Sequence, residues 1–141
     1  MNIGVLRRHH ADILKNVRLL DEALNKNISF EHAAQIEKLL VGFFNDLEMH
    51  LTSEGKFLYP FLKRSPNIDI RERANNLENR MRIIQNAFSR YKLKWNCKES
   101  IVSDSVSFSF ETRSFLSKLC KLMDKEESEL FHLLERDEKK E

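Results

Sequence analysis

The sequence predicts an all-α fold, an antiparallel up-down-up-down four-helix bundle. Glycine and proline, on which the turns of all-β folds depend, number only 3 and 2 in 141 residues. The pattern breaks in three places, 25–29, 64–67 and 96–105. The four segments between the breaks are about 20 to 35 residues long, well above the mean length of a globular helix. Short connections between long helices favour the up-down order.

Each segment carries apolar residues at alternating spacings of three and four, which places them along one face of a helix. In the first segment this stripe consists of Ile3, Leu6, His10, Ile13, Val17, Leu20 and Leu24. Ser29 can cap the second helix. The stripe of the second helix consists of Ile36, Leu40, Phe43, Leu47, His50, Glu54, Phe57 and Phe61.

The third helix is expected after Pro66, which disfavours helical conformation at Ser65. Its stripe consists of Ile70, Ala74, Leu77, Met81, Ile84, Phe88, Tyr91 and Trp95. The alternation in 106–110 is typical of a strand, but nothing else in the chain offers a pairing partner, so we assign it to the start of the last helix. The stripe of that helix consists of Leu116, Leu119, Met123, Glu126, Leu130 and Leu133.

Composition limits the possible functions. With 41% apolar and 33% charged residues, 1–141 is expected to form a single globular domain. The net charge of +2 comes from interspersed charges of both signs, so we expect no nucleic-acid partner. We expect no membrane segment either, because no apolar run approaches about 18 residues. No signal peptide is visible, and Cys97 and Cys120 suit free thiols in the cytoplasm. No nucleophilic or nucleotide-binding motif occurs, so no enzyme activity is expected.

Four residues interrupt the apolar stripes with polar side chains: His10, His50, Glu54 and Glu126. Imidazoles and carboxylates are the ligands of hard and borderline transition metals. His50 and Glu54 stand four residues apart, so both project from one face of their helix. A buried carboxylate needs a cation, either a metal ion or an Arg or Lys that reaches inward. Three other interpretations remain open: a histidine is a hydrogen-bonded core residue, Glu54 or Glu126 lies at a solvated edge of its stripe, or Glu127 or Met123 faces inward in place of Glu126.

One geometric estimate opposes a shared site. If the chain folds at the middles of its connections, His10 lies about two turns from the level of His50, or about 10 Å at ~1.5 Å per residue. Glu126 is displaced by a similar amount, unless the connections are unequal in length.

Three stretches resemble the hemerythrin-like family, also called the HHE cation-binding domain. The stretch from His50 to Pro60, HLTSEGKFLYP, resembles the family's His-x3-Glu-Glu-x2-Leu-Phe-Pro motif on helix 2. The stretch from Leu122 to Phe131, LMDKEESELF, resembles the helix 4 motif, and Leu6-x3-His10-x2-Ile13 resembles the opening helix. The resemblance implies a four-helix bundle that holds two irons. It makes His10 and His50 ligands of one iron, and Glu54 and Glu126 the bridging carboxylates.

The chain departs from this family pattern at the second iron. Leu122 occupies the histidine position of helix 4, and helix 3 has no histidine, its equivalent being Gln85 or Ile84. The resemblance therefore implies a reduced, mononuclear site of His10, His50, Glu54 and Glu126 rather than a full di-iron centre. Such a site would bind one non-haem iron, or manganese or zinc, in a module that responds to iron, oxygen or nitric oxide.

The alternative is a metal-free regulatory bundle. Leu122 with Ile83 or Ile84 would then fill the vacated half of the site, where the family holds its second iron. The two glutamates would be protonated or paired with arginine. Its partner surface would use some of the 10 phenylalanines, and the candidates are Phe30, Phe44, Phe108 and Phe115. Both interpretations expect a protein partner, because no output module is fused to the bundle.

The remaining histidines and tyrosines receive structural roles. His9, His32 and His132 are expected at solvated or interfacial positions. Tyr59 and Tyr91 could lend a hydroxyl to a metal pocket, although a tyrosine near a core is more often hydrogen-bonded structure.

Overall fold

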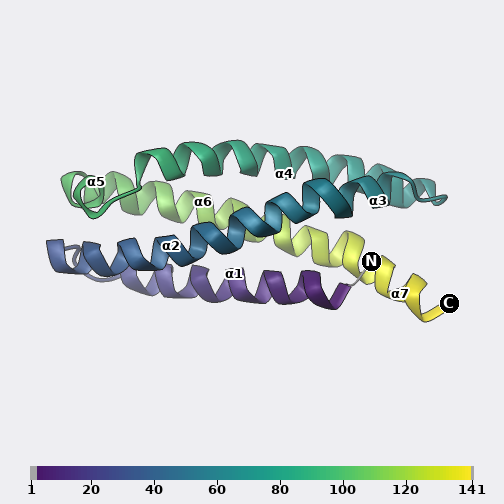
Figure 1. Cartoon of the computed structure of the whole chain (residues 1–141), viewed down its shortest axis with the longest axis horizontal. Coiled ribbons are helices and arrows are strands. Elements are labelled where there is room, and N and C mark those ends of the chain that lie inside the picture. The colour runs from purple at the N-terminus through teal and green to yellow at the C-terminus, as the bar shows by residue number, and fades with distance from the viewer. Residues whose placement is uncertain (1–2, 141) are drawn as a thin grey trace.

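The structure is a computed structural model that describes residues 3–140, with side chains described up to Arg136. The described chain is all-helical and contains no strand, as the sequence predicts. The long helices α1 (Ile3–Leu24), α2 (Phe30–Ser53), α4 (Ile68–Lys94) and α6 (Ser105–Glu126) run lengthwise through the molecule (Figure 1). No helix among the described residues is long and apolar enough to cross a membrane.

Two of the helical stretches change their winding near one end. After α2 comes a π-helical turn, η1 (Glu54–Leu58), followed by the short helix α3 (Tyr59–Lys63). After α6 comes a second π-helical turn, η2 (Glu127–Phe131), followed by α7 (His132–Lys140). A short helix, α5 (Lys98–Ser103), lies between α4 and α6.

Polar side chains cap three of the helices. Ser29 Oγ accepts a hydrogen bond from the His32 N–H at the start of α2, as expected. Asn67 accepts hydrogen bonds from two backbone N–H groups of α4, and Asp104 accepts one from Ser107 at the start of α6. Such caps satisfy N–H groups that have no partner within the helix.

The strand-like 106–110 segment is helical, as predicted, because it belongs to the first turns of α6.

The third expected break is more ordered than the sequence indicates. Helix α5 occupies most of 96–105, because Ile101 is fully buried and anchors it to the core. The Lys98 N–H at its start donates a 2.6 Å hydrogen bond to Glu37 of α2. Cys97, just before this helix, is a free thiol, as is Cys120.

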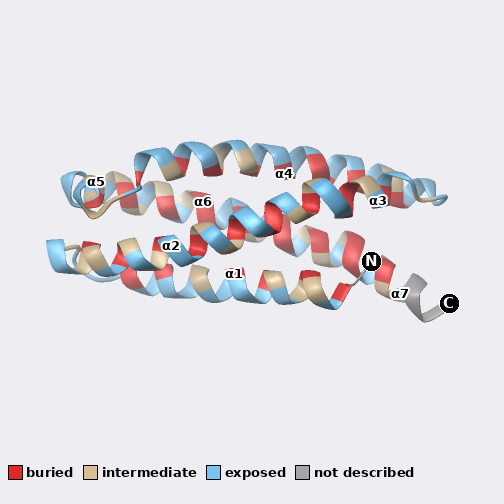
Figure 2. Ribbon diagram, viewed as in Figure 1, coloured by how far each residue is buried: buried red, intermediate tan, exposed pale blue. Residues whose placement is uncertain are grey.

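The stripes of the first and third segments are buried nearly as predicted. All eight stripe residues from Ile70 to Trp95 are buried. Of the seven stripe residues in α1, six are buried and Val17 is partly exposed. Buried residues line the inner faces of the helices, whereas exposed residues cover the outer faces (Figure 2).

The predicted stripe fails after Glu54, where η1 begins. Phe57 is 65% exposed and Phe61 is also exposed, whereas Leu58, Tyr59 and Leu62 are buried. A π-helical turn holds one more residue than an α-helical turn, so it moves the buried face one position along the chain. Pro60 has no N–H to donate, and the wider turn removes the clash that a proline causes inside an α-helix. The shift recurs after η2, where Leu134 is buried and Leu133 only partly so.

The expected offset between His10 and His50 is wrong, because the first connection does not fold at its middle. Asn16 donates a 2.8 Å hydrogen bond to Asp46, and the rings of His10 and His50 lie 4.7 Å apart. The residue midway in sequence between His10 and His50 is Phe30, and the one midway between Asn16 and Asp46 is Glu31. The chain therefore reverses direction about the start of α2 and not about the middle of the connection. The connection 25–29 therefore carries the chain beyond the end of α1 before α2 turns back (Figure 1).

Two of the four phenylalanines proposed for a partner surface are core residues. Phe108 and Phe115 are buried, whereas Phe30 is exposed and Phe44 is half-buried. Phe115 stacks on Phe88, and Phe108 contacts Trp95 edge-on. Aromatic pairs of this kind add about 0.5–1.5 kcal/mol each beyond the area they bury.

The register shift at η1 predicts opposite outcomes for two neighbouring residues. Leu58→Ala should lower the free energy of unfolding by about 2–5 kcal/mol, because it removes a fully buried side chain. Phe57→Ala, the matched control, should change it by less than about 0.5 kcal/mol. Urea denaturation measures both, and the reverse order would show that the α-helical register continues through this segment.

Candidate metal centre

The structure brings together the four polar residues that interrupt the stripes. His10 comes from α1, His50 from α2, Glu54 from the first position of η1 and Glu126 from the end of α6. Each offers a nitrogen or oxygen ligand atom, and these atoms all lie within 4.8 Å of one another. All four side chains are buried. Side chains from three separate helical stretches thus surround one point in the core.

The ligand atoms pair imidazole with carboxylate. His10 Nε2 lies 3.3 Å from Glu126 Oε1, and His50 Nε2 lies 3.3 Å from Glu54 Oε1. Glu126 rather than Glu127 faces inward, since the Glu126 side chain is fully buried and that of Glu127 is 38% exposed. The Nε2 atoms of both histidines therefore face the carboxylates.

The outer nitrogens of the two histidines face other side chains. His10 Nδ1 lies 3.5 Å from Glu127 Oε1, and Glu127 forms an ion pair with Arg7. His50 Nδ1 lies 3.5 Å from Nδ1 of His9. Ligating histidines usually have a polar partner on the ring nitrogen that does not bind the metal, which fixes the orientation of the ring. Phe131 also stacks on His10, with ring centroids 5.0 Å apart.

Tyr59 holds one oxygen of Glu126. Its hydroxyl donates a 2.7 Å hydrogen bond to Glu126 Oε2 and leaves Oε1 on the side of the histidines. Burial, with a smaller contribution from the charge of Glu78, raises the pKa of Tyr59. The hydroxyl therefore keeps its proton and remains a donor at neutral pH. Tyr59 thus serves the site by orienting Glu126.

Six buried atoms of the four residues have no hydrogen-bond partner. They are both ring nitrogens of His10, Nε2 of His50, both carboxylate oxygens of Glu54, and Oε1 of Glu126. Among the described side chains, no Lys or Arg forms an ion pair with Glu54 or Glu126. Leaving a buried polar group unpaired costs about 1–3 kcal/mol, and more for a charged one. Residues and geometry therefore fit a cation bound among them.

Burial shifts the pKa of one imidazole and one carboxylate of the site, those of His50 and Glu126. Burial, followed by the nearby His10 and His9, lowers the pKa of His50 to about 3. Its ring is therefore neutral at pH 7, the form that binds metals. Burial also raises the pKa of Glu126, although the contact with His10 partly offsets this effect. A bound cation would reverse the effect on the carboxylate.

The half of the site that would hold a second iron is apolar. Leu122 and Ile84 are buried, whereas Gln85 is half-buried and Ile83 is 64% exposed. Ile84 is thus the inward residue of the two candidates for the missing histidine of helix 3. The expectation that Ile83 could fill the vacated half is wrong, because Ile83 lies on the outer face of α4.

Sequence reasoning missed the residues around the four. It placed His9 at an interface without a role, and it considered Glu127 only as a replacement for Glu126. His9 directly precedes His10, and Glu127 directly follows Glu126. This adjacency in sequence was the signal that could have predicted their position beside the site. The two π-helical turns also escaped prediction: Glu54 is the first residue of η1, and Glu126 directly precedes η2. Such turns often occur at functional sites.

Comparisons with known proteins agree with the resemblance seen in the motifs. No curated protein and no solved structure matches the chain. A family model, that of the hemerythrin HHE cation binding domain, matches residues 1–134. The match covers nearly all of the 141 residues, including every residue of the candidate site. The chain therefore belongs to the hemerythrin HHE cation-binding domain family.

Proposed function

We propose that this protein is a metal-binding module in which one divalent cation, foremost non-haem iron, is held inside an antiparallel up-down-up-down four-helix bundle. The chain forms this bundle as a single domain over 1–141. Family membership supports metal binding, and the buried histidine and glutamate cluster supports the site. The apolar residues in the other half support one cation rather than two.

The observation that carries this proposal is the set of buried polar atoms without partners, of which five, all except the outer His10 Nδ1, would be satisfied by one cation. A metal-free interaction bundle would need those atoms satisfied by other means, such as an arginine or a proton on each glutamate. The described side chains place no arginine there, and Glu54 has no hydrogen-bond partner on either oxygen. One cation would satisfy Glu54 and Glu126 together, which protonation of one carboxylate does not achieve.

Each residue has a specific task in the proposed site. His10 and His50 bind through Nε2, and Glu54 binds through its carboxylate. Glu126 binds through Oε1, because Tyr59 occupies Oε2. Two nitrogens and two carboxylates suit iron, manganese or zinc. Bound iron would supply one-electron chemistry and open positions for a small ligand such as oxygen or nitric oxide.

We further propose a sensing or regulatory role rather than catalysis. No acid or base besides the proposed ligands and Tyr59 contacts the inner face of the site among the described residues. The free thiols Cys97 and Cys120 suit a reducing compartment such as the cytoplasm. A sensing role requires a protein partner.

Metal analysis of tag-free protein prepared under anaerobic conditions tests the proposal. We expect about one iron, manganese or zinc per chain, and a rise in Tm on addition of Fe(II) or Zn(II). At free metal about 100 times above Kd, the gain in stability is about 2.7 kcal/mol. His50→Ala should abolish both effects, whereas the exposed His132→Ala should leave them unchanged. Undiminished metal content in His50→Ala would contradict the proposal.

A second prediction separates a metal ligand from a structural residue. Glu54→Gln should remove most of the bound metal and raise the stability of the metal-free protein at neutral pH by about 1–2 kcal/mol. The increase follows because the variant no longer buries an unpaired carboxylate. Glu48→Gln, at an exposed surface pair, should change stability by less than about 0.5 kcal/mol. A large loss of stability in metal-free Glu54→Gln would instead indicate a structural role.

A third prediction concerns the vacated half. The double variant Ile84→His/Leu122→His should raise the iron content from about one toward two per chain, because both residues are buried and the family resemblance assigns their positions to the histidines of the second iron. In the matched control Ile83→His/Leu122→His, one histidine points to solvent, so the content should stay near one. Elemental analysis and near-ultraviolet absorption measure the outcome. Equal iron content in the two variants would show that the inward position on α4 does not matter.

A further inference from the structure

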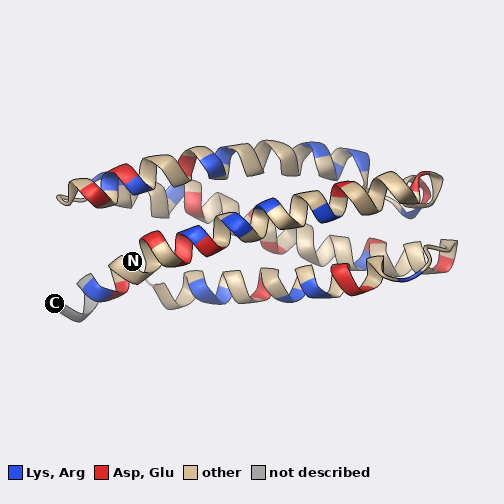
Figure 3. Ribbon diagram, turned by 180° about the vertical axis from the view of Figure 1, so that it is seen from behind, with Lys and Arg blue, Asp and Glu red and all other residues tan. Residues whose placement is uncertain are grey.

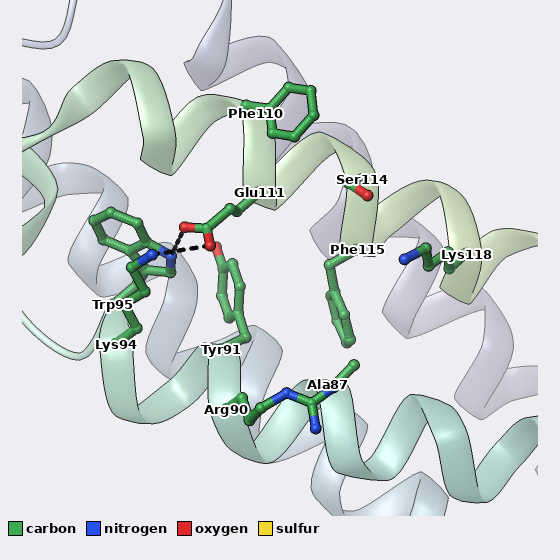
Figure 4. A pocket seen from close by; sticks show the side chains of 10 residues that line it. All are labelled: Ala87, Arg90, Tyr91, Lys94, Trp95, Phe110, Glu111, Ser114, Phe115 and Lys118. Carbon is green, nitrogen blue, oxygen red and sulfur yellow. Dashed lines mark hydrogen bonds and ion pairs between the residues drawn. The ribbon is translucent and has the colours of Figure 1, made fainter.

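A surface groove runs between α4 and α6. Two neighbouring hollows of about 340 Å³ and 190 Å³, both lined by Lys118, lie along it. Figure 4 shows the larger hollow, with Ser114 and Lys118 on α6 facing Ala87 and Arg90 on α4. The lining extends along α4 from Arg80 to Lys94 and includes Trp95 directly after the helix. At ~1.5 Å per residue this distance is about 22 Å, or four helical turns.

The groove has an apolar floor and two exposed apolar side chains. Ile84 and Leu122 form the floor of the smaller hollow, and Ala87 and Phe115 belong to the larger one. Ile83 and Phe110 also line the groove and are 64% and 74% exposed. Large exposed apolar residues beside a polar rim mark interaction sites.

The two helices that flank the groove carry an excess of positive charge in these stretches. After Glu78, α4 contains five basic residues and no acidic one: Arg80, Arg82, Arg90, Lys92 and Lys94. In α6 no acidic residue occurs between Glu111 and Asp124, and that stretch contains Arg113, Lys118 and Lys121. Seen from behind, the C-terminal half of α4 shows basic but no acidic bands (Figure 3). Basic and acidic residues are nearly equal in number over the whole chain, but basic residues predominate in these two stretches of α4 and α6.

Most of the basic residues in the groove have no partner. Arg80, Arg90, Lys118 and Lys121 form no hydrogen bond or ion pair with other described residues. The only acidic residue of the lining is Glu111, which accepts 3.0 Å hydrogen bonds from Lys94 and from the Trp95 indole (Figure 4). Glu111 therefore neutralises one end of the groove and leaves four cations along the rest.

We propose that this groove docks an acidic amphipathic helix of a partner protein. An apolar stripe on such a helix would cover Ile83, Ile84 and Phe110, and flanking carboxylates would face the unpaired cations on both walls. The length of the lining suits a helix of about four turns, and helices commonly bind in apolar grooves through residues spaced three and four apart. The inference goes beyond metal binding and does not depend on it.

Other occupants match the groove less well. A small anion in the larger hollow would meet the carboxylate of Glu111. A bilayer is flat, whereas the apolar floor lies recessed between two helices. A nucleic acid would use the cations but not the aliphatic floor formed by Ile84 and Leu122.

Fluorescence anisotropy with the full-length protein tests the proposal. The probe is a labelled synthetic helix of about 18 residues, with leucine at spacings of three and four and glutamate on both flanks. We expect saturable binding that weakens with salt, because the flanking contacts are electrostatic. Lys118→Glu/Lys121→Glu should raise Kd about tenfold or more, and Ile83→Ser/Phe110→Ser should do likewise. All four residues are exposed, and circular dichroism would confirm unchanged folding.

Matched controls use exposed residues outside the groove. Lys15→Glu/Lys38→Glu makes the same change in charge, and Val41→Ser/Phe57→Ser removes comparable apolar surface. Both should keep Kd within about twofold. The proposal is overturned by equal losses in groove and control variants, by equal binding of a scrambled peptide, or by no saturation below about 1 mM. Tighter binding of RNA or of anionic vesicles that the groove variants abolish would overturn it as well.

Discussion

The burial of two carboxylates within an apolar bundle is the constraint on which the rest of the structure depends. Glu54 and Glu126 are fully buried, and Glu54 has no hydrogen-bond partner at all. A fold built for stability alone would place leucine at both positions, as it does at Leu122. Natural proteins keep such unfavourable groups where function requires them. A bound cation would satisfy both carboxylates together, so that metal binding would also stabilise the bundle.

The backbone is shaped around the same two residues. Each site glutamate stands at the start of a π-helical turn, and beyond each turn the buried face is displaced by one residue. The first displacement brings Tyr59 into the core, where its hydroxyl reaches Glu126. Without this displacement by one residue, the position of Tyr59 would belong to Leu58, which has no hydroxyl. The irregular turn and the orientation of a proposed ligand are therefore linked.

Helix positions and the members of the site could be predicted because they depend on local spacing. The stripe from Ile70 to Trp95 follows from apolar periodicity alone, and the four site residues follow from the places where periodicity fails. Features set by tertiary packing could not be predicted in this way. The displacement after Glu54 depends on a backbone turn, and the level of His10 depends on the path of 25–29. Phe115 was assigned to the surface because sequence alone does not show how wide the buried face is.

The vacated half of the site and the surface groove meet at the same residues. Ile84 and Leu122 stand where the family resemblance places the histidines of a second iron, and they also line the smaller hollow between α4 and α6. Histidines at these positions would bring polar atoms to that floor and weaken its contact with an apolar partner. Aliphatic side chains there give the groove its apolar base, and they would leave the proposed cation with the half formed by His10 and His50.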